Sequence, residues 1–160
     1  MEERLTHLSD HSALFSHDGI HDSQTHLAAP PFFYEQLRRE VAHSMRTQMS
    51  FSAVKITFMP RIVDGERPQL GAEDILRFSC ELRSLIRGSE CIGRLGVNEC
   101  VVLISDGETA AQQLITRLHS TPSLSVNHTL HISLSMVTSL QGESGLELLN
   151  RLDEAPLSTH

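Results

Sequence analysis

Cysteine and histidine are the residue types in this chain that most often bind metal ions or form covalent bonds. The three cysteines, Cys80, Cys91 and Cys100, are an odd number without a C-x-x-C pair, which is typical of free, buried thiols. Five of the ten histidines fall in the first 26 residues, and His7 and His11 would share one helix face. Zinc needs two further ligands at a suitable spacing, and the residues between these histidines favour a loop. We therefore predict a polar N-terminal segment, no metal and no cofactor.

The stretch RLGVNECVVLI, residues 94–104, holds a second group of candidate residues. Its glycine-containing tip, followed by an apolar run, predicts a β-hairpin. A glycine lets the backbone come close to a phosphate, and a carboxylate can hold a divalent ion. The tip is therefore either an active site or the remains of one; its residues are Gly96, Val97, Asn98, Glu99 and Cys100.

Hydrophobic periodicity predicts the elements that hold this tip in place. Apolar residues at helical spacing predict helices over residues 31 to about 49 and about 72 to 87. Two more helices are predicted in DGETAAQQLITRLHS, with Asp106 as N-cap, and in GESGLELLNRLDEA. Strands are predicted at 51–58, 91–94, 99–104 and in HTLHISLSMVTS. This order indicates an α/β or α+β fold in which helices flank a central mixed sheet.

Composition limits the classes of protein to which the chain can belong. With 160 residues, 39% of them apolar and 21% charged, one soluble domain is expected. The net charge of −7 offers no basic surface for nucleic acid. The apolar runs are too short to cross a bilayer, and the acidic, polar start does not resemble a secretory signal. We predict a cytoplasmic protein without membrane insertion.

Four segments match one known family in order and spacing. DSQTHLAAPPFF keeps Asp22, Thr25, Leu27 and Phe33 of the pattern D-x-L-T-G-L-x-N-R-R-x-F, and it is followed by ELRSLIRGSE, HISLSMVTS and GLELLNRLDEA. Together they resemble the GGDEF family, the diguanylate cyclase domains that join two GTP molecules into cyclic di-GMP. The resemblance implies a fold related to the nucleotide cyclases. It divides the chain into a polar lead-in (1–21), a GGDEF-like domain (22–155) and a tail (156–160).

The resemblance also allows the active site to be compared by position. The family's metal-binding Asp corresponds to Lys55, and its two guanine-binding residues correspond to Val63 and Ala72. In the signature loop, the second Gly has become Val97 and the acidic third residue has become Asn98, while Gly96 and Glu99 remain and Cys100 follows. The resemblance therefore implies a degenerate site.

Electrostatics indicates how much the change at Lys55 matters. Cyclisation needs Mg²⁺ ions held by carboxylates. At an effective dielectric near ~20, each pair of unit charges ~4 Å apart contributes about 4 kcal/mol, which becomes repulsion when Lys replaces Asp. A β-branched Val97 also disfavours positive φ and fills space that a triphosphate needs. An alternative is that the Lys55 ammonium holds a phosphate directly.

A second family site has a partial counterpart before the hairpin. Many members bind cyclic di-GMP through an inhibitory R-x-x-D motif, and this chain has Arg87-Gly88-Ser89-Glu90 at that position, with Arg117 on the next helix. An Arg fork can hold guanine or phosphate. The alternative is that Arg87 merely complements the C-terminal dipole of its helix.

Two functions therefore remain open. The first is an inactive GGDEF-type domain that regulates bacterial signalling through a protein partner or through self-association. The second is a cyclic di-GMP receptor that uses Arg87, Glu90 and Arg117. The low aromatic content of 4% offers few stacking platforms for bases and favours the first.

Overall fold

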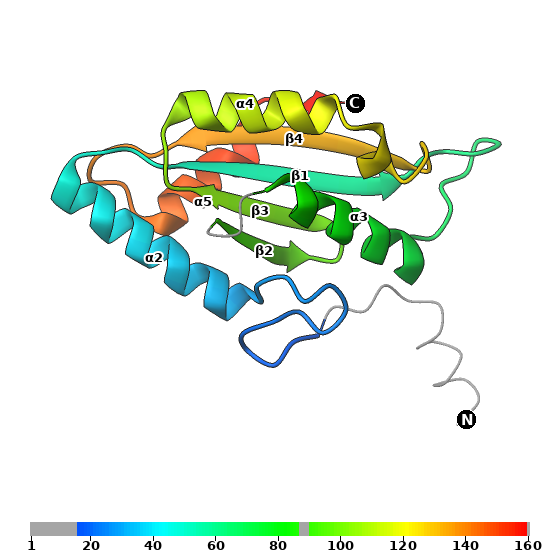
Figure 1. Ribbon diagram of the computed structural model, residues 1–160, viewed down its shortest axis with the longest axis horizontal. Helices are drawn as coiled ribbons and strands as arrows, with labels where there is room; N and C mark the ends of the chain where they lie inside the picture. Colours follow the sequence, from blue (N-terminus) through cyan, green and yellow to red (C-terminus); the bar gives the residue numbers. More distant parts are fainter. Residues whose placement is uncertain (1–15, 87–89, 160) are drawn as a thin grey trace.

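The structure is a computed structural model that describes residues 16–86 and 90–159. Its central element is a five-stranded sheet of order β2-β3-β1-β4-β5 (Figure 1). The elements along the chain are α2 (Pro30–Thr47), β1 (Ser52–Pro60), α3 (Ala72–Leu85), β2 (Cys91–Gly96), β3 (Glu99–Ile104), α4 (Glu108–His119), the 3₁₀ helix η1 (Pro122–Ser125), β4 (Leu130–Thr138), α5 (Gly145–Glu154) and β5 (Ser158–Thr159).

The predicted α+β class is confirmed, and the sheet differs from the prediction in one respect. All four pairings of its named strands are antiparallel, whereas a mixed sheet was expected. The helix between β1 and β2 carries the chain past β3, which returns between them in the opposite direction. The alternation of helices and strands along the chain is therefore compatible with an antiparallel sheet, because the hairpin places β3 between β1 and β2.

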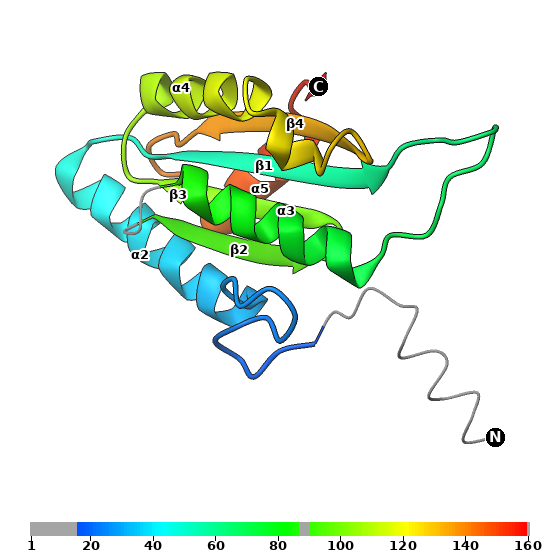
Figure 2. The ribbon, with the colours of Figure 1, turned by 45° about the vertical axis from the view of Figure 1, so that its right-hand side comes forward.

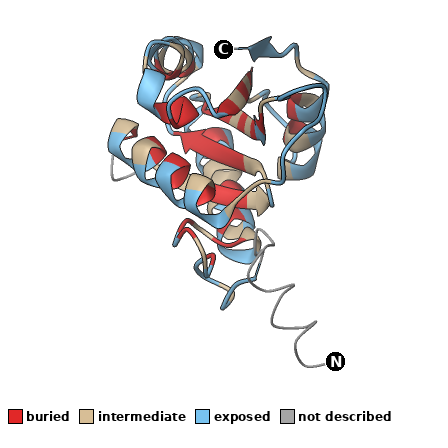
Figure 3. Cartoon of the chain, turned by 90° about the vertical axis from the view of Figure 1, so that its right-hand side faces the viewer, coloured by how far each residue is buried: buried red, intermediate tan, exposed pale blue. Residues whose placement is uncertain are grey.

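Helices lie on both faces of the sheet (Figure 2), and each face has its own hydrophobic core. Alternate side chains of β1 point to opposite faces: Val54, Ile56 and Phe58 pack with α3 and α4, while Ala53 packs with α2 and α5. Figure 3 shows buried residues along the strands and on the inner sides of the helices. Lys55 has the parity of Ala53 and therefore lies on the α2–α5 face.

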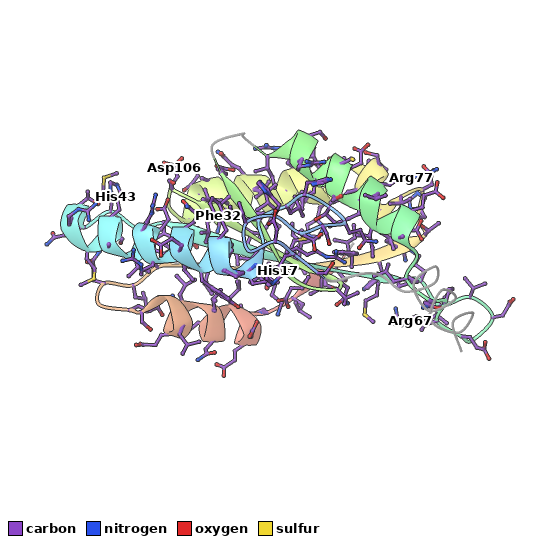
Figure 4. The ribbon with its side chains drawn as sticks, turned by 90° about the horizontal axis from the view of Figure 1, so that it is seen from below. His17, Phe32, His43, Arg67, Arg77 and Asp106 are labelled. Carbon is purple, nitrogen blue, oxygen red and sulfur yellow. The ribbon has the colours of Figure 1, made fainter. Side chains whose placement is uncertain are left out.

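Most predicted elements are found with shifted ends, and one predicted cap is wrong. Helix α4 has Gly107 rather than Asp106 as its N-cap, and no side chain there accepts a capping hydrogen bond. Asp106 precedes this N-cap by one residue and lies in the bend before the helix (Figure 4). Helix α3 ends at Leu85, and Arg87 lies outside the described residues. Ser158 and Thr159, predicted to be tail, pair with β4.

A long loop between β1 and α3, residues 61–71, extends beyond the end of β1 (Figures 1 and 2). We call it the arm. Val63 and Glu66 exchange two backbone hydrogen bonds of 2.7 and 3.0 Å. Asp64 and Gly65 between them have φ values of 52° and 80°, as a tight hairpin turn requires. Arg67 secures the base by donating to the Pro60 carbonyl over 2.6 Å.

The segment before α2 covers the outer edge of β2. The Ala28 N–H donates to the Ile92 carbonyl, and the Arg94 N–H donates to the Ala28 carbonyl, each over 2.9 Å. Leu27 and Ala29 on either side are buried. A strand edge that would otherwise expose its backbone groups is therefore closed. Among the residues the structure describes, no helix is long and apolar enough to span a membrane.

Candidate functional site

Lys55, the single lysine of the sequence, lies between two carboxylates from different elements. Its Nζ is 2.9 Å from Oδ1 of Asp153 on α5 and 3.4 Å from Oε1 of Glu99 at the start of β3. Its side chain is 14% exposed. Burial opposes the charge, but the hydrogen bond to Asp153 and the negative charges of both carboxylates outweigh it and raise the pKa of the ammonium. Lys55 is therefore a cation held by two anions.

The surroundings of Lys55 are polar toward the hairpin tip. Register places Val101 and Ser135 beside Lys55, and Glu99 and Ser133 beside the next residue on the same face, Thr57. Ser135 is buried, and its Oγ has no hydrogen-bond partner in the described part of the chain. The part of the α2–α5 face near the hairpin tip therefore carries hydroxyls and charges, whereas the rest of that face carries apolar side chains.

The hairpin tip is a short turn at Val97 and Asn98. The Asn98 carbonyl accepts a hydrogen bond of 3.1 Å from the Phe58 N–H, which ties the tip to β1. Gly96 lies at a register irregularity in β2. Neither Val97 nor Asn98 has a positive φ, so the turn accommodates the β-branched Val97 without the left-handed strain that the sequence suggested. Val97 is 40% exposed.

Arg94 anchors the same tip from the opposite face of the sheet. It pairs in register with Cys100, whose side chain belongs to the α3–α4 core. Its guanidinium donates to Asp22 Oδ2 at 3.0 Å, to Gln24 Oε1 at 2.9 Å and to the Val97 carbonyl at 2.8 Å. The Arg94 and Asp22 side chains are both fully buried. This ion pair therefore fixes the segment before α2 against the hairpin.

Sequence reasoning selected Asp22 and Thr25 but missed Arg94. Asp22 Oδ2 also accepts from the Thr25 N–H and hydroxyl, both at 2.7 Å, so the three residues form one buried network. A signal was present, since an arginine in an otherwise apolar strand (CIGRLG) needs a buried anion. Its distant partner could not be identified from spacing.

The three cysteines are free thiols; Cys100 is buried as predicted, whereas Cys91 is half-buried. Burial raises the pKa of Cys91 to about 11 and that of Cys100 to about 12. Cys80 on α3 is exposed, so its predicted burial is wrong. Within residues 16–86 and 90–159, no group of three or more metal-binding side chains comes together. His7 and His11 lie outside the described residues.

The two positions aligned with guanine binding lie at the arm and its end. Val63 is 58% exposed within the arm's hairpin. Ala72 is the exposed first residue of α3, directly after its N-cap Gly71. Their side chains are a branched hydrocarbon and a methyl group, which can neither donate nor accept a hydrogen bond. Arg67 on the arm (Figure 4) is engaged with backbone.

Comparison with known proteins gives one curated relative and many structures, while no family model matches. Diguanylate cyclase TpbB of Pseudomonas aeruginosa is 26% identical over 151 residues, 89% of this chain and 35% of that protein. The chain therefore spans about a third of the length of this curated relative.

Three solved structures illustrate the structural likeness. The diguanylate cyclase SiaD of P. aeruginosa, in complex with its activator SiaC, gives a TM-score of 0.71 with 20% identity over 97% of this chain and 60% of that one. The GGDEF domain of Caulobacter crescentus DgcB, in complex with cyclic di-GMP, gives 0.70 with 15% identity over 88% and 90%. The P. aeruginosa FimX GGDEF domain gives 0.65 with 16% identity over 84% and 90%. This chain has the GGDEF fold.

Within the GGDEF fold, the residues aligned with the inhibitory site come together in part. Arg87 lies outside the described residues. Glu90 and Arg117 line one small pocket of about 90 Å³, together with Asp106. Arg117 Nη1 donates to the Leu85 carbonyl over 2.6 Å, so its guanidinium caps the end of α3. Glu90 also borders a larger pocket of about 460 Å³ that includes Arg83 and Phe32.

Proposed function

We propose that this GGDEF-fold domain does not synthesise cyclic di-GMP and acts as a regulatory protein-interaction module in the cytoplasm of a bacterium. One observation carries the proposal: the Lys55 ammonium occupies the position that the family resemblance assigns to a metal-binding Asp, and it engages Glu99 and Asp153. The protein's own cation therefore already pairs with both carboxylates and offsets part of their negative charge. A divalent ion would have to displace Lys55 and then lie beside it, which the charges oppose.

The guanine positions support the same proposal. Val63 and Ala72 cannot read the hydrogen-bonding edge of a base, and a site built on hydrogen bonds loses most of its discrimination when they are absent. The apolar Val97 at the hairpin tip takes the place of a backbone that could approach phosphates. Metal binding and substrate binding are thus both compromised, at independent positions.

A partner protein is the second half of the proposal. SiaD, which shares the fold, is found in complex with its activator SiaC, so a protein of this fold can be joined to a regulator. Several large apolar residues of this chain are exposed, including Met59 on β1, Ile62 and Val63 on the arm, and Val97 at the hairpin tip. Such exposed apolar residues are typical of interaction surfaces when they lie close together.

The decisive test is a synthesis assay. Purified protein incubated with GTP and Mg²⁺ or Mn²⁺ is expected to form no cyclic di-GMP, as measured by chromatography, and Lys55→Asp alone is expected not to restore activity because Val63, Ala72 and Val97 are unchanged. Cyclic di-GMP that forms with the wild-type protein and is lost in Glu99→Gln would overturn the proposal.

A second candidate is a cyclic di-GMP receptor that uses Arg87, Glu90 and Arg117. The observation in its favour is that Glu90 and Arg117 line the same pocket. DgcB, whose GGDEF domain was solved with cyclic di-GMP, shows that the fold can bind this nucleotide. Calorimetric titration with cyclic di-GMP tests this candidate, and the absence of heat at ~100 µM ligand, where a Kd of that order gives a measurable signal, would eliminate it.

A further inference from the structure

One edge of the sheet is only partly paired. Strand β4 pairs with β1 along all nine of its residues, but with β5 only at Ser133 and Leu134. In the part of the chain that the structure describes, the outer edge from Ser135 to Thr138 has no strand partner. The other outer strand, β2, is covered at Gly93 by Ala28.

Hydrogen bonds establish which backbone groups of β4 face outward. The Ser139 N–H donates to the Phe51 carbonyl over 2.8 Å, so the odd-numbered residues of β4 bond to β1 and the even-numbered ones face away. The outward direction is confirmed at both ends: Leu134 O accepts from Ser158 Oγ, and Thr138 O accepts from Arg151 Nη2 over 2.7 Å. Met136 therefore directs both its N–H and its carbonyl outward, and Thr138 directs its N–H outward.

Proline explains why β5 leaves this stretch open. Extending the β4–β5 register from Leu134 and Ser158 places Pro156 opposite Met136. A proline has no N–H and cannot donate to the Met136 carbonyl. Pairing with β5 therefore stops at Ser158, and the edge continues without it.

A groove lies directly on the open stretch. It has a volume of about 510 Å³, and its floor is the edge of β4 from Leu134 to Thr138. One wall is formed by Glu108, Gln112 and Ile115 of α4, and the other includes Arg151 and Pro156. The side chains of residues 135–138 carry no charge. Natural sheets usually protect such edges with charges, prolines or covering segments, and here the edge itself has no charge.

The charges around the groove are unequal. Arg151 is matched by Glu143, which accepts two of its hydrogen bonds. On the opposite wall, the Glu108 carboxylate is in contact with the neutral amide of Gln112 at 3.2 Å. The groove therefore presents a negative charge beside an uncharged floor, which complements a basic residue.

We propose that this groove binds an extended segment of a partner protein, which adds to the sheet as a strand beside Met136 and Thr138. Main-chain hydrogen bonds to the outward groups provide the pairing, apolar side chains alternate along the floor, and a Lys or Arg lies against Glu108. The edge is recessed between α4 and the α5–β5 connection, which favours a slender segment over the same edge of a second copy. This inference deepens the proposed interaction function and depends on it.

Peptide selection with a residue-resolved readout tests the proposal. A random heptapeptide library displayed on phage is panned against the full chain, and enriched peptides are synthesised and added to ¹⁵N-labelled protein. Enriched sequences are expected to alternate apolar residues with at least one Lys or Arg. Binding is expected to slow hydrogen exchange of the Met136 and Thr138 amides at least tenfold, while the Ser135 and Val137 amides, already bonded to β1, change little.

Adjacent positions of α4 provide a matched pair of variants. Gln112→Arg places a positive charge on the groove wall and is expected to weaken binding of the basic peptides at least tenfold. Gln113→Arg adds the same charge to the neighbouring residue, which lines the pocket of Glu90 and Arg117 instead, and is expected to leave affinity unchanged. Both positions are exposed, so both variants should fold.

Four outcomes would overturn the proposal: no peptide is enriched, enriched peptides protect other amides, the two variants weaken binding equally, or the Met136 and Thr138 amides are already as protected as those of Ser135 and Val137 in the free chain. The last outcome would mean that the chain's own residues cover the edge. Peptides that bind elsewhere would reject the groove but leave an interaction module in place. Synthesis of cyclic di-GMP would reject the proposed function independently of the amide data.

Discussion

Two cations flank the β2–β3 hairpin on opposite faces of the sheet and serve different purposes. Arg94 is fully buried and binds Asp22, Gln24 and the Val97 carbonyl. Lys55, whose side chain is 14% exposed, lies between Glu99 at 30% and Asp153 at 64% side-chain exposure. The buried pair holds the hairpin in position, whereas the contact of Lys55 joins β1 to the start of β3 and to α5 at a partly exposed site. The fold can therefore be retained while the site changes, because different residues support each.

The largest expected effect is at the buried pair. Arg94→Met leaves Asp22 as an unpaired buried charge, so we expect a loss of about 3–5 kcal/mol in the free energy of unfolding, measured by urea denaturation. Arg38→Met is the control, because Arg38 is 71% exposed in a helical pair with Glu35, and it is expected to cost less than about 0.5 kcal/mol.

A smaller loss is expected from Gly93→Ala next to Arg94. A Cβ at Gly93 would lie 2.4 Å from Cδ2 of the buried Phe33 ring, so the ring or the strand must move. Overpacking of this kind costs about 1–3 kcal/mol. The same substitution at Gly71, where the nearest atom to a new Cβ is 3.8 Å away, serves as control. Equal losses at both glycines would show that Phe33 yields easily.

Lys55→Met should cost much less than Arg94→Met. Both carboxylate partners of Lys55 reach solvent, and exposed pairs contribute about 0–1 kcal/mol, so urea denaturation should show a loss of at most ~1 kcal/mol. A loss as large as that of Arg94→Met would contradict the contrast between the buried Arg94–Asp22 pair and the partly exposed contacts of Lys55.

The pH dependence should sharpen the assignment of Lys55. Its folded pKa is raised, so its contribution is fully present below the unfolded value near ~10.4 and is lost as pH rises through the folded value. The difference in stability between wild type and Lys55→Met is therefore expected to be constant from about pH 7 to 9 and to disappear in more alkaline buffer. A difference that already changes between about pH 7 and 9 would mean that burial outweighs the two carboxylates and lowers the pKa of Lys55.

The smallest effect is expected at Ser135→Ala. This buried hydroxyl has no partner within the described residues, so removing it relieves an unsatisfied group and loses no hydrogen bond. The free energy of unfolding should change by less than about 0.5 kcal/mol or rise slightly. A loss above about 1 kcal/mol would reveal a bound water or a partner outside the described residues.

Sequence patterns predicted the elements better than their contacts. Phe33 and Leu37 at helical spacing identified α2, and the turn-forming residues after Arg94 identified the hairpin, because these signals are local. The ion pair of Arg94 with Asp22 joins residues 72 positions apart, and the contact of Lys55 with Asp153 requires α5 to pack on the sheet. Neither contact leaves a pattern in the spacing. The elements were thus predictable from local patterns, but the long-range partners of Arg94 and Lys55 were not.

Strand β1 lies in the middle of the sheet, which determines what happens when the polypeptide is cleaved in the arm. Because β1 is hydrogen-bonded to β3 on one side and to β4 on the other, a single break in the arm between Arg61 and Arg67 would not release it. Brief digestion with trypsin should therefore yield two fragments that migrate together under native conditions and separate only in denaturant. A tag inserted at this loop would leave the sheet intact for the same reason.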